Sequence, residues 1–180
     1  MKLKGVYIAF IVIFALLLLL SYVLFGNYYK NVDALWGRIT GSLKMVYIIS
    51  ILLSSVAFIL VFTYLVMKDN YRNNKEQLIL FLLILGFFIS SMFWMPLSFE
   101  YLKLKTKSKN NLTSLSTYSS SIIFTLFIVS MFVLGLMIYL IKLPFTNKEK
   151  PMRIVAIISC AYLFFHCFFF DFILWNYHFF

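Results

Sequence analysis

The chain has 180 residues, of which 63% are hydrophobic, 21% aromatic and only 12% charged, with a formal net charge of +10. A soluble domain usually has about 25% charged residues, so this composition excludes a soluble fold. An apolar run of about 18 residues or more can cross the hydrocarbon core of a bilayer as a helix. The sequence therefore predicts a single all-α domain, residues 1–180, forming an integral membrane bundle with helices at about 5–25, 46–67, 78–98, 121–141 and 154–175.

The first predicted helix follows Lys2 and Lys4, an arrangement that also opens secretory signal peptides. The apolar run is too long for a signal peptide and lacks a small-x-small cleavage site, so we expect a retained helix. The connection that follows, 26–45, contains Trp36 and Arg38. An indole beside a basic residue is typical of the membrane interface, and the alternative is a short surface or re-entrant helix whose Arg38 meets a lipid phosphate or pairs with Asp33 or Glu100.

Small side chains mark the second predicted helix, where Ser50 and Ser54 lie one turn apart. Small residues at this spacing let neighbouring helices approach closely and form interhelical hydrogen bonds, so they predict packing.

The end of the third predicted helix combines aromatic residues with a proline, in the order Trp94, Met95, Pro96 and then Phe99. Proline lacks a backbone donor and clashes with the preceding turn, so we expect a kink or a break near Trp94. A kink at this position would make room for a ligand.

Two connections carry further signals. Asn111 begins an Asn-Leu-Thr tripeptide, which predicts a glycosylation site in the connection 99–120. Pro144 and Pro151 lie in the connection 142–153, where they are expected to interrupt any continuous helix.

Asp171, in the fifth predicted helix, is the charged residue that lies within an apolar run. A charged Asp at membrane depth costs about 2.5–3.5 kcal/mol, so we expect it to face the bundle interior and to accept a hydrogen bond from another segment. The alternative is a shallow carboxylate near the interface, beside Trp175. His166 lies five positions earlier, about 140° around an α-helix, so the spacing predicts that His166 and Asp171 do not form one site.

The two cysteines, Cys160 and Cys167, lie two turns apart on one helix face and are expected to serve packing. The sequence has no zinc-ligand spacing, phosphate-binding glycine loop or nucleophile motif. It predicts no metal site and no cofactor, and it favours a role other than catalysis.

Basic residues indicate the orientation. With five crossings, the N-terminus shares a side with the second and fourth connections, and that side has more Lys and Arg than the other. This bias favours a cytoplasmic N-terminus and places Asn111 on the opposite side. Basic residues that flank membrane helices meet lipid phosphates, so no nucleic-acid partner is expected. The richer side carries Lys2, Lys4, Lys68, Arg72, Lys75, Lys142, Lys148, Lys150 and Arg153, and the other carries Lys30, Arg38, Lys44, Lys103, Lys105, Lys107 and Lys109.

Two resemblances can be named on these motifs. The stretch from Leu35-Trp36-Gly37 to Ser50, with Trp94-Met95-Pro96-Leu97, resembles uncharacterised small multi-pass membrane proteins of algae and large DNA viruses. The count of five helices, with Trp94 and Pro96 near the end of the third, is also similar to the tryptophan-rich sensory protein (translocator) family. The second resemblance implies a bundle that binds tetrapyrroles or sterols, although this chain has only three Trp residues.

The leading hypothesis is binding or transport of a small hydrophobic ligand within the bundle. Its predicted ligand-binding residues are Trp94, Met95, Pro96, Phe99, His166 and Asp171, and its predicted membrane-interface residues are Trp36, Arg38 and Trp175. The rival hypothesis is a structural or assembly membrane protein without a ligand, whose small residues Ser50, Ser54, Gly86 and Gly135 contact other chains. The expected partners are the lipid bilayer, a small hydrophobic ligand and further copies of the chain in a homo-oligomer.

Overall fold

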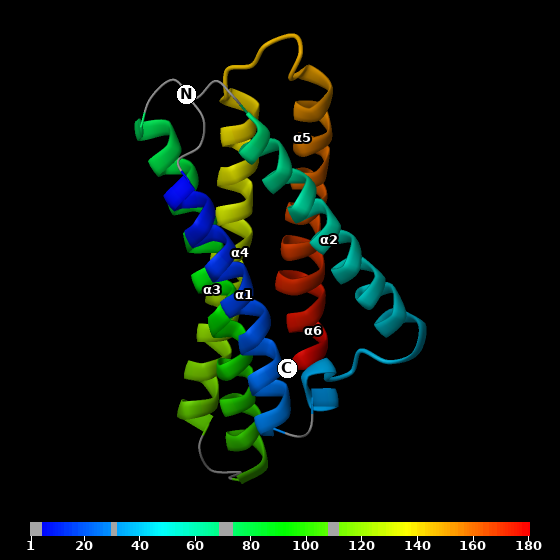
Figure 1. Ribbon diagram of the computed structural model, residues 1–180. Helices are drawn as coiled ribbons and strands as arrows, with labels where there is room; N and C mark the ends of the chain where they lie inside the picture. The colour runs from blue at the N-terminus through cyan, green and yellow to red at the C-terminus, as the bar shows by residue number, and fades with distance from the viewer. Residues whose placement is uncertain (1–4, 30–31, 69–73, 108–111) are drawn as a thin grey trace.

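The computed structural model describes residues 5–29, 32–68, 74–107 and 112–180, and within these ranges the fold is all-α, as predicted. Five of its helical stretches are long and apolar enough to cross a membrane. The last three elements follow one another without a break and form one long rod (Figure 1). The elements are α1 (Gly5–Tyr29), the 3-10 helix η1 (Val32–Trp36), α2 (Gly41–Met67), α3 (Asn74–Lys107), α4 (Leu112–Lys142), α5 (Lys150–Phe165), the π-helix η2 (His166–Trp175) and α6 (Asn176–Phe179).

The helices extend beyond the apolar runs. The predicted connection 99–120 is wrong for most of its length, because α3 continues to Lys107 and α4 begins at Leu112. Polar residues here support the helix locally: Thr117 Oγ1 donates to the Thr113 carbonyl (3.0 Å), and Lys103 pairs with Glu100 one turn away (2.6 Å). Hydrophobicity marks the part of a helix that suits hydrocarbon, whereas backbone hydrogen bonding continues wherever side chains permit it.

Pro96 lies inside the continuous helix α3, so of the kink or break predicted near Trp94 the break is wrong, and the kink stays a prediction. In contrast, the predicted connection after α4 is confirmed, because residues 143–149, which include Pro144, are not helical. Pro151 lies in the first turn of α5, where a helix needs no backbone donor, so it begins a helix instead of ending one.

The main packing pairs are α3 with α4, α2 with α5, α1 with α3, and α4 with α5. The close approach of α3 and α4 depends on two glycines: a Cβ at Gly86 would lie 2.3 Å from the Phe132 ring, and one at Gly135 would lie 2.9 Å from Leu83. α1 and α2 are neighbours in sequence but pack on different helices, and the C-terminal rod is visible between them (Figure 1).

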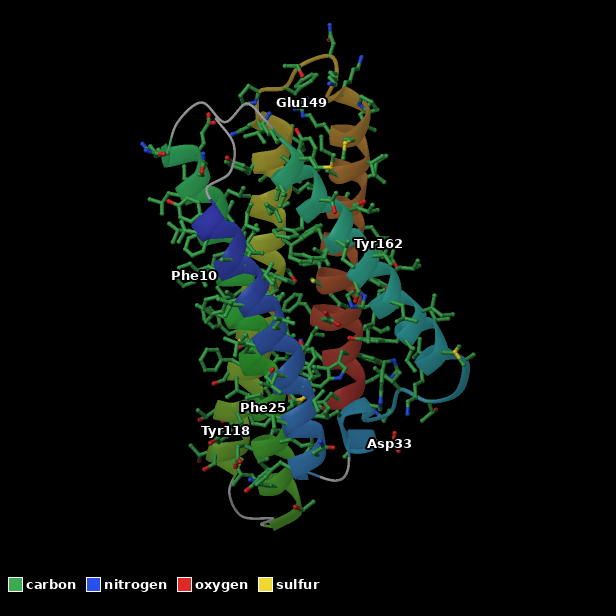
Figure 2. All side chains as sticks on the ribbon, in the orientation of Figure 1. Phe10, Phe25, Asp33, Tyr118, Glu149 and Tyr162 are labelled. Carbon is green, nitrogen blue, oxygen red and sulfur yellow. The ribbon has the colours of Figure 1, made fainter. Side chains whose placement is uncertain are left out.

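Polar contacts between segments distant in the sequence hold each end of the bundle together. At the end where α1 begins and α5 starts, Lys68 is 1% exposed, and its Nζ donates to the Pro144 carbonyl and lies 3.4 Å from Glu149 Oε2. Figure 2 shows Glu149 at this end, directly before α5. In the sequence Lys68 was notable only as a basic residue in a connection. In the structure its side chain is buried and joins the end of α2 to the connection between α4 and α5.

At the opposite end, the segment between η1 and α2 forms hydrogen bonds with the last residues of the C-terminal rod. Arg38 N donates to the His178 carbonyl (3.0 Å) and Arg38 Nη2 to the Tyr177 carbonyl (2.9 Å). The alternative in which Arg38 pairs with Asp33 or Glu100 is therefore wrong, since Asp33 pairs with Lys44 (2.9 Å) and Glu100 with Lys103 (2.6 Å). Helix C-termini attract such donors because their last carbonyls lack intrahelical partners.

Candidate functional site: a cavity within the bundle

A cavity of about 630 Å³ lies inside the bundle and is lined by residues from all five candidate membrane spans and from η1. This volume falls within the range of about 300–1,000 Å³ that is typical of small-molecule sites. Its walls are mainly apolar and aromatic. Representative lining residues are Ile11, Ala15, Tyr22, Trp36, Tyr47, Phe58, Phe87, Phe88, Ser91, Trp94, Met95, Leu126, Val129, Leu163, His166, Cys167, Asp171 and Trp175.

The cavity opens sideways, between α1 and α2. Among its lining residues, those with a high exposed fraction come from these two helices, including Leu16 (60%) and Leu19 (62%) on α1 and Ile59 (60%) on α2. Lining residues from α4 are buried, as Leu126 and Val129 are 4% exposed. An opening framed by exposed aliphatic side chains on two spans would face lipid hydrocarbon.

A polar cluster forms one part of the wall. The Tyr47 hydroxyl, on α2, donates to Asp171 Oδ1, on η2, and His166 Nε2 lies 3.6 Å from the same oxygen. The prediction that Asp171 accepts a hydrogen bond from another segment is confirmed. The Asp171 side chain is 25% exposed although it lies within a candidate span, and it lines the cavity. The carboxyl group therefore faces the cavity rather than tightly packed protein.

The helix type explains why His166 and Asp171 meet. Both residues belong to the π-helix η2, in which hydrogen bonds join residues five apart. Five residues bring a side chain back to the same face of a π-helix, whereas in an α-helix that spacing separates them by about 140°. The prediction that the two residues do not share a site is therefore wrong, because it assumed α-helical geometry.

On its other side, away from the cavity, His166 is linked through hydrogen bonds to two further polar residues. Its Nδ1 lies 2.8 Å from Ser50 Oγ, which lies 3.0 Å from the Tyr162 hydroxyl. Figure 2 shows Tyr162 on α5, beside α2. If Nε2 carries the hydrogen toward Asp171, Nδ1 accepts from Ser50 and Ser50 accepts from Tyr162, so each group in the chain has a partner.

Ser50, His166 and Asp171 follow the hydroxyl, imidazole and carboxylate order of serine hydrolases. The hydroxyl is nevertheless poorly placed for attack on a ligand, because Ser50 is 3% exposed and does not line the cavity. The arrangement instead joins α2 to the C-terminal rod through polar contacts.

Aromatic residues close the cavity near η1. Trp94 Nε1 donates to the Tyr22 hydroxyl (3.1 Å), and the Trp94 ring meets the Trp175 ring edge-on at 5.4 Å. Trp175 Nε1 donates to the Leu35 carbonyl (2.8 Å), and Trp175 is 3% exposed. Trp175 is therefore packed inside the protein, and its predicted place at the membrane interface stays a prediction. Trp36 is half-buried and lines the cavity, with its ring 5.4 Å from Tyr47.

Of the six predicted ligand-binding residues, the structure brings four to the cavity: Trp94, Met95, His166 and Asp171. Pro96 and Phe99 are not lining residues, and Phe99 is 3% exposed within a hydrophobic cluster.

Sequence reasoning missed Tyr22, Tyr47 and Trp175 as parts of the cavity. A signal was available for Tyr47, because Tyr47, Ser50 and Ser54 recur at spacings of three and four and so share one face of α2. Tyr22 had no comparable signal.

Other predicted sites have different outcomes. Cys160 and Cys167 are buried free thiols, in agreement with a packing role. Asn111 lies outside the described residues. Within the described ranges, no group of three or more His, Cys, Asp or Glu residues is placed to hold a metal ion.

Comparisons of the chain with protein-family models, with curated proteins and with solved structures found no match. The structure itself therefore supports the description of an all-α protein with five candidate membrane spans, suited to a lipid bilayer.

Proposed function

We propose that the chain binds a small hydrophobic molecule, for storage or transport, in the cavity between its five candidate membrane spans. The observation that carries this proposal is the cavity of about 630 Å³, with an apolar wall, a polar cluster and an opening between α1 and α2. A predominantly apolar pocket with a few convergent polar groups is the usual form of a small-molecule site.

The opening supports entry of the ligand from the bilayer. A hydrophobic molecule concentrates in lipid, and the exposed aliphatic residues Leu16, Leu19 and Ile59 would offer it a continuous apolar path. The resemblance to the translocator family, which binds tetrapyrroles and sterols, makes these two classes the first ligands to test.

Purified protein in detergent, tested for thermal stabilisation by sterols, tetrapyrroles and lipids, provides the experiment. Binding to the folded state raises the melting temperature with ligand concentration. The variant Ala15→Phe places a ring in the cavity and should remove the shift, whereas Leu20→Phe, at a residue that is 50% exposed and does not line the cavity, should keep it. Folded protein that no ligand of these classes stabilises would contradict the proposal.

The rival role in assembly receives less support from the packing. Ser50 bonds within the chain, and Gly86 and Gly135 face Phe132 and Leu83 of the same chain, so these small residues do not remain available to a partner. Crosslinking in native membranes tests this alternative: a dominant oligomer, together with no ligand response, would favour assembly.

A further inference from the structure

Most hydrogen-bond donors on the cavity wall already donate to another group of the protein. Ser54 Oγ donates to the Ile51 carbonyl (2.8 Å), and Ser91 Oγ donates to the Phe87 carbonyl (2.7 Å). Trp94 and Trp175 donate to Tyr22 and Leu35, as described above. A ligand therefore meets few free donors on this wall.

Tyr47 also uses its hydrogen, which it donates to Asp171 Oδ1. The Tyr22 hydroxyl accepts from Trp94 and keeps its own hydrogen, so it remains a donor. The described lining thus offers a ligand the Tyr22 hydroxyl and the Trp36 indole N–H as donors, and it includes no Lys or Arg.

Acceptor capacity is present at Asp171. A carboxyl group has two oxygens, and the contacts to Tyr47 and His166 both involve Oδ1. The side chain is 25% exposed toward the cavity that it lines. Oδ2 is therefore available to accept a hydrogen bond from a molecule in the cavity.

We infer that the ligand is an amphiphile whose polar group is a hydrogen-bond donor, a hydroxyl or an ammonium, and that Asp171 Oδ2 accepts from it. This inference rests on the proposed function. It disfavours carboxylic acids, which would place a second carboxyl group near Asp171 with no Lys or Arg in the described lining to pair with it. It also disfavours ethers, which have no hydrogen to donate to Asp171 Oδ2.

The test uses four probes with the same pyrene-butyl body and different ends: an alcohol, an amine, a methyl ether and a carboxylic acid. The full chain is reconstituted in phosphatidylcholine vesicles, and energy transfer from its tryptophans to pyrene reports binding. We expect the alcohol, the amine or both to bind about tenfold more tightly than the ether and the acid, the usual effect of a hydrogen bond to a charged group.

Three variants test whether Asp171 causes the preference for probes with a hydrogen-bond donor. Asp171→Leu should make the alcohol and the ether bind alike. Ser130→Ala should leave the preference unchanged, because Ser130 does not line the cavity and its hydroxyl donates to the Leu126 carbonyl of its own helix (3.0 Å). Asp171→Asn separates the two donor classes, because an amide oxygen still accepts from an alcohol but gives up the ionic attraction to an ammonium. If Asp171→Leu does not fold, the ranking of probes on the unmodified chain and on Asp171→Asn still decides.

The outcomes separate the two proposals. Equal binding of all four probes to the unmodified chain, or a preference that survives Asp171→Leu, overturns the inference and leaves the proposed function standing. Absence of binding by every probe to folded protein overturns both.

Discussion

The Asp171 carboxyl group is held in the bundle by a hydrogen bond from Tyr47, a residue far from it in the sequence. Tyr47 and Asp171 are 124 residues apart, and the Tyr47 hydroxyl donates to the carboxyl oxygen. A carboxyl group within an apolar bundle is costly unless it is hydrogen-bonded, so this contact offsets part of the cost of having Asp171 there.

The first prediction concerns that contact. Tyr47→Phe removes the donor and keeps the ring, so we expect the free energy of unfolding to fall by about 1–3 kcal/mol. Denaturation in a mixed detergent, followed by circular dichroism, measures the change. Tyr177→Phe is the matched control, because Tyr177 is 73% exposed and should lose almost nothing. Equal stability of the two variants would mean that the contact contributes little.

Gly37 is the second residue on which the fold depends. Its φ is +52°, in the region that favours glycine, and a Cβ there would lie 2.6 Å from the His178 carbonyl oxygen. Gly41 has a similar φ, +56°, but nothing within 4 Å of a Cβ. A substitution at Gly41 therefore tests backbone strain alone, whereas one at Gly37 tests the same strain together with a steric clash against the C-terminal rod.

We predict that Gly41→Ala loses about 1–2 kcal/mol, the cost of left-handed backbone in a residue with a Cβ. Gly37→Ala should lose about 2–5 kcal/mol, because overpacking adds to the same strain. The same detergent denaturation measures both. If the two losses are the same, the contact between residue 37 and the C-terminal rod does not determine stability.

At the scale of the element, the C-terminal rod is unusual because α5 continues into ten residues of π-helix, His166–Trp175. π-helical turns are rare and occur mostly as short insertions at functional sites. Here the π-helical geometry aligns His166 with Asp171 and directs the carboxyl group into the cavity.

A deletion tests this geometry. Removing Phe169 leaves His166 and Asp171 four positions apart, the spacing at which an α-helix places residues on one face. We expect this variant to fold with a melting temperature near that of the unmodified chain. Removing Ile158 from the α-helical part should lower the melting temperature markedly, because it turns the two halves of the rod by about 100° relative to each other. The two residues are a fair match, since Phe169 is 42% and Ile158 64% exposed. A larger loss for the Phe169 deletion would argue against this account of the π-helix.

At the scale of the whole molecule, five successive spans place the start of α1 and the α4–α5 connection at one end and the α1–α2 connection at the other (Figure 1). Both cysteines are buried, so a new surface cysteine can be labelled against a quiet background.

We predict that Asn147→Cys and Thr40→Cys, both at exposed positions, react with an impermeant maleimide from opposite sides of a sealed membrane. The excess of basic residues predicts that residue 147 faces the cytoplasm. Labelling of both positions from the same side would contradict the five-span topology. Labelling of residue 40 from the cytoplasm would reverse the orientation alone.

The sequence by itself determined the all-α class and the five candidate membrane spans, because a long apolar run has to form its backbone hydrogen bonds within itself when it leaves water. It also determined the interruption at Pro144, since proline geometry is local. The hydrogen bond to Asp171 could be expected on energetic grounds, although its donor could not be named.

Only the tertiary structure decided which side chains surround the cavity, because Tyr22, Tyr47 and Trp175 come from three helices whose contacts no local pattern specifies. It also decided that Trp175 is buried and that Arg38 clasps the C-terminal rod, since both outcomes depend on how η1 packs against α6. The pairing of His166 with Asp171 was the clearest failure of sequence reasoning. Helical periodicity predicts which residues share a face only when the type of helix is known, and residues 166–175 form a π-helix, which no local pattern in the sequence indicated.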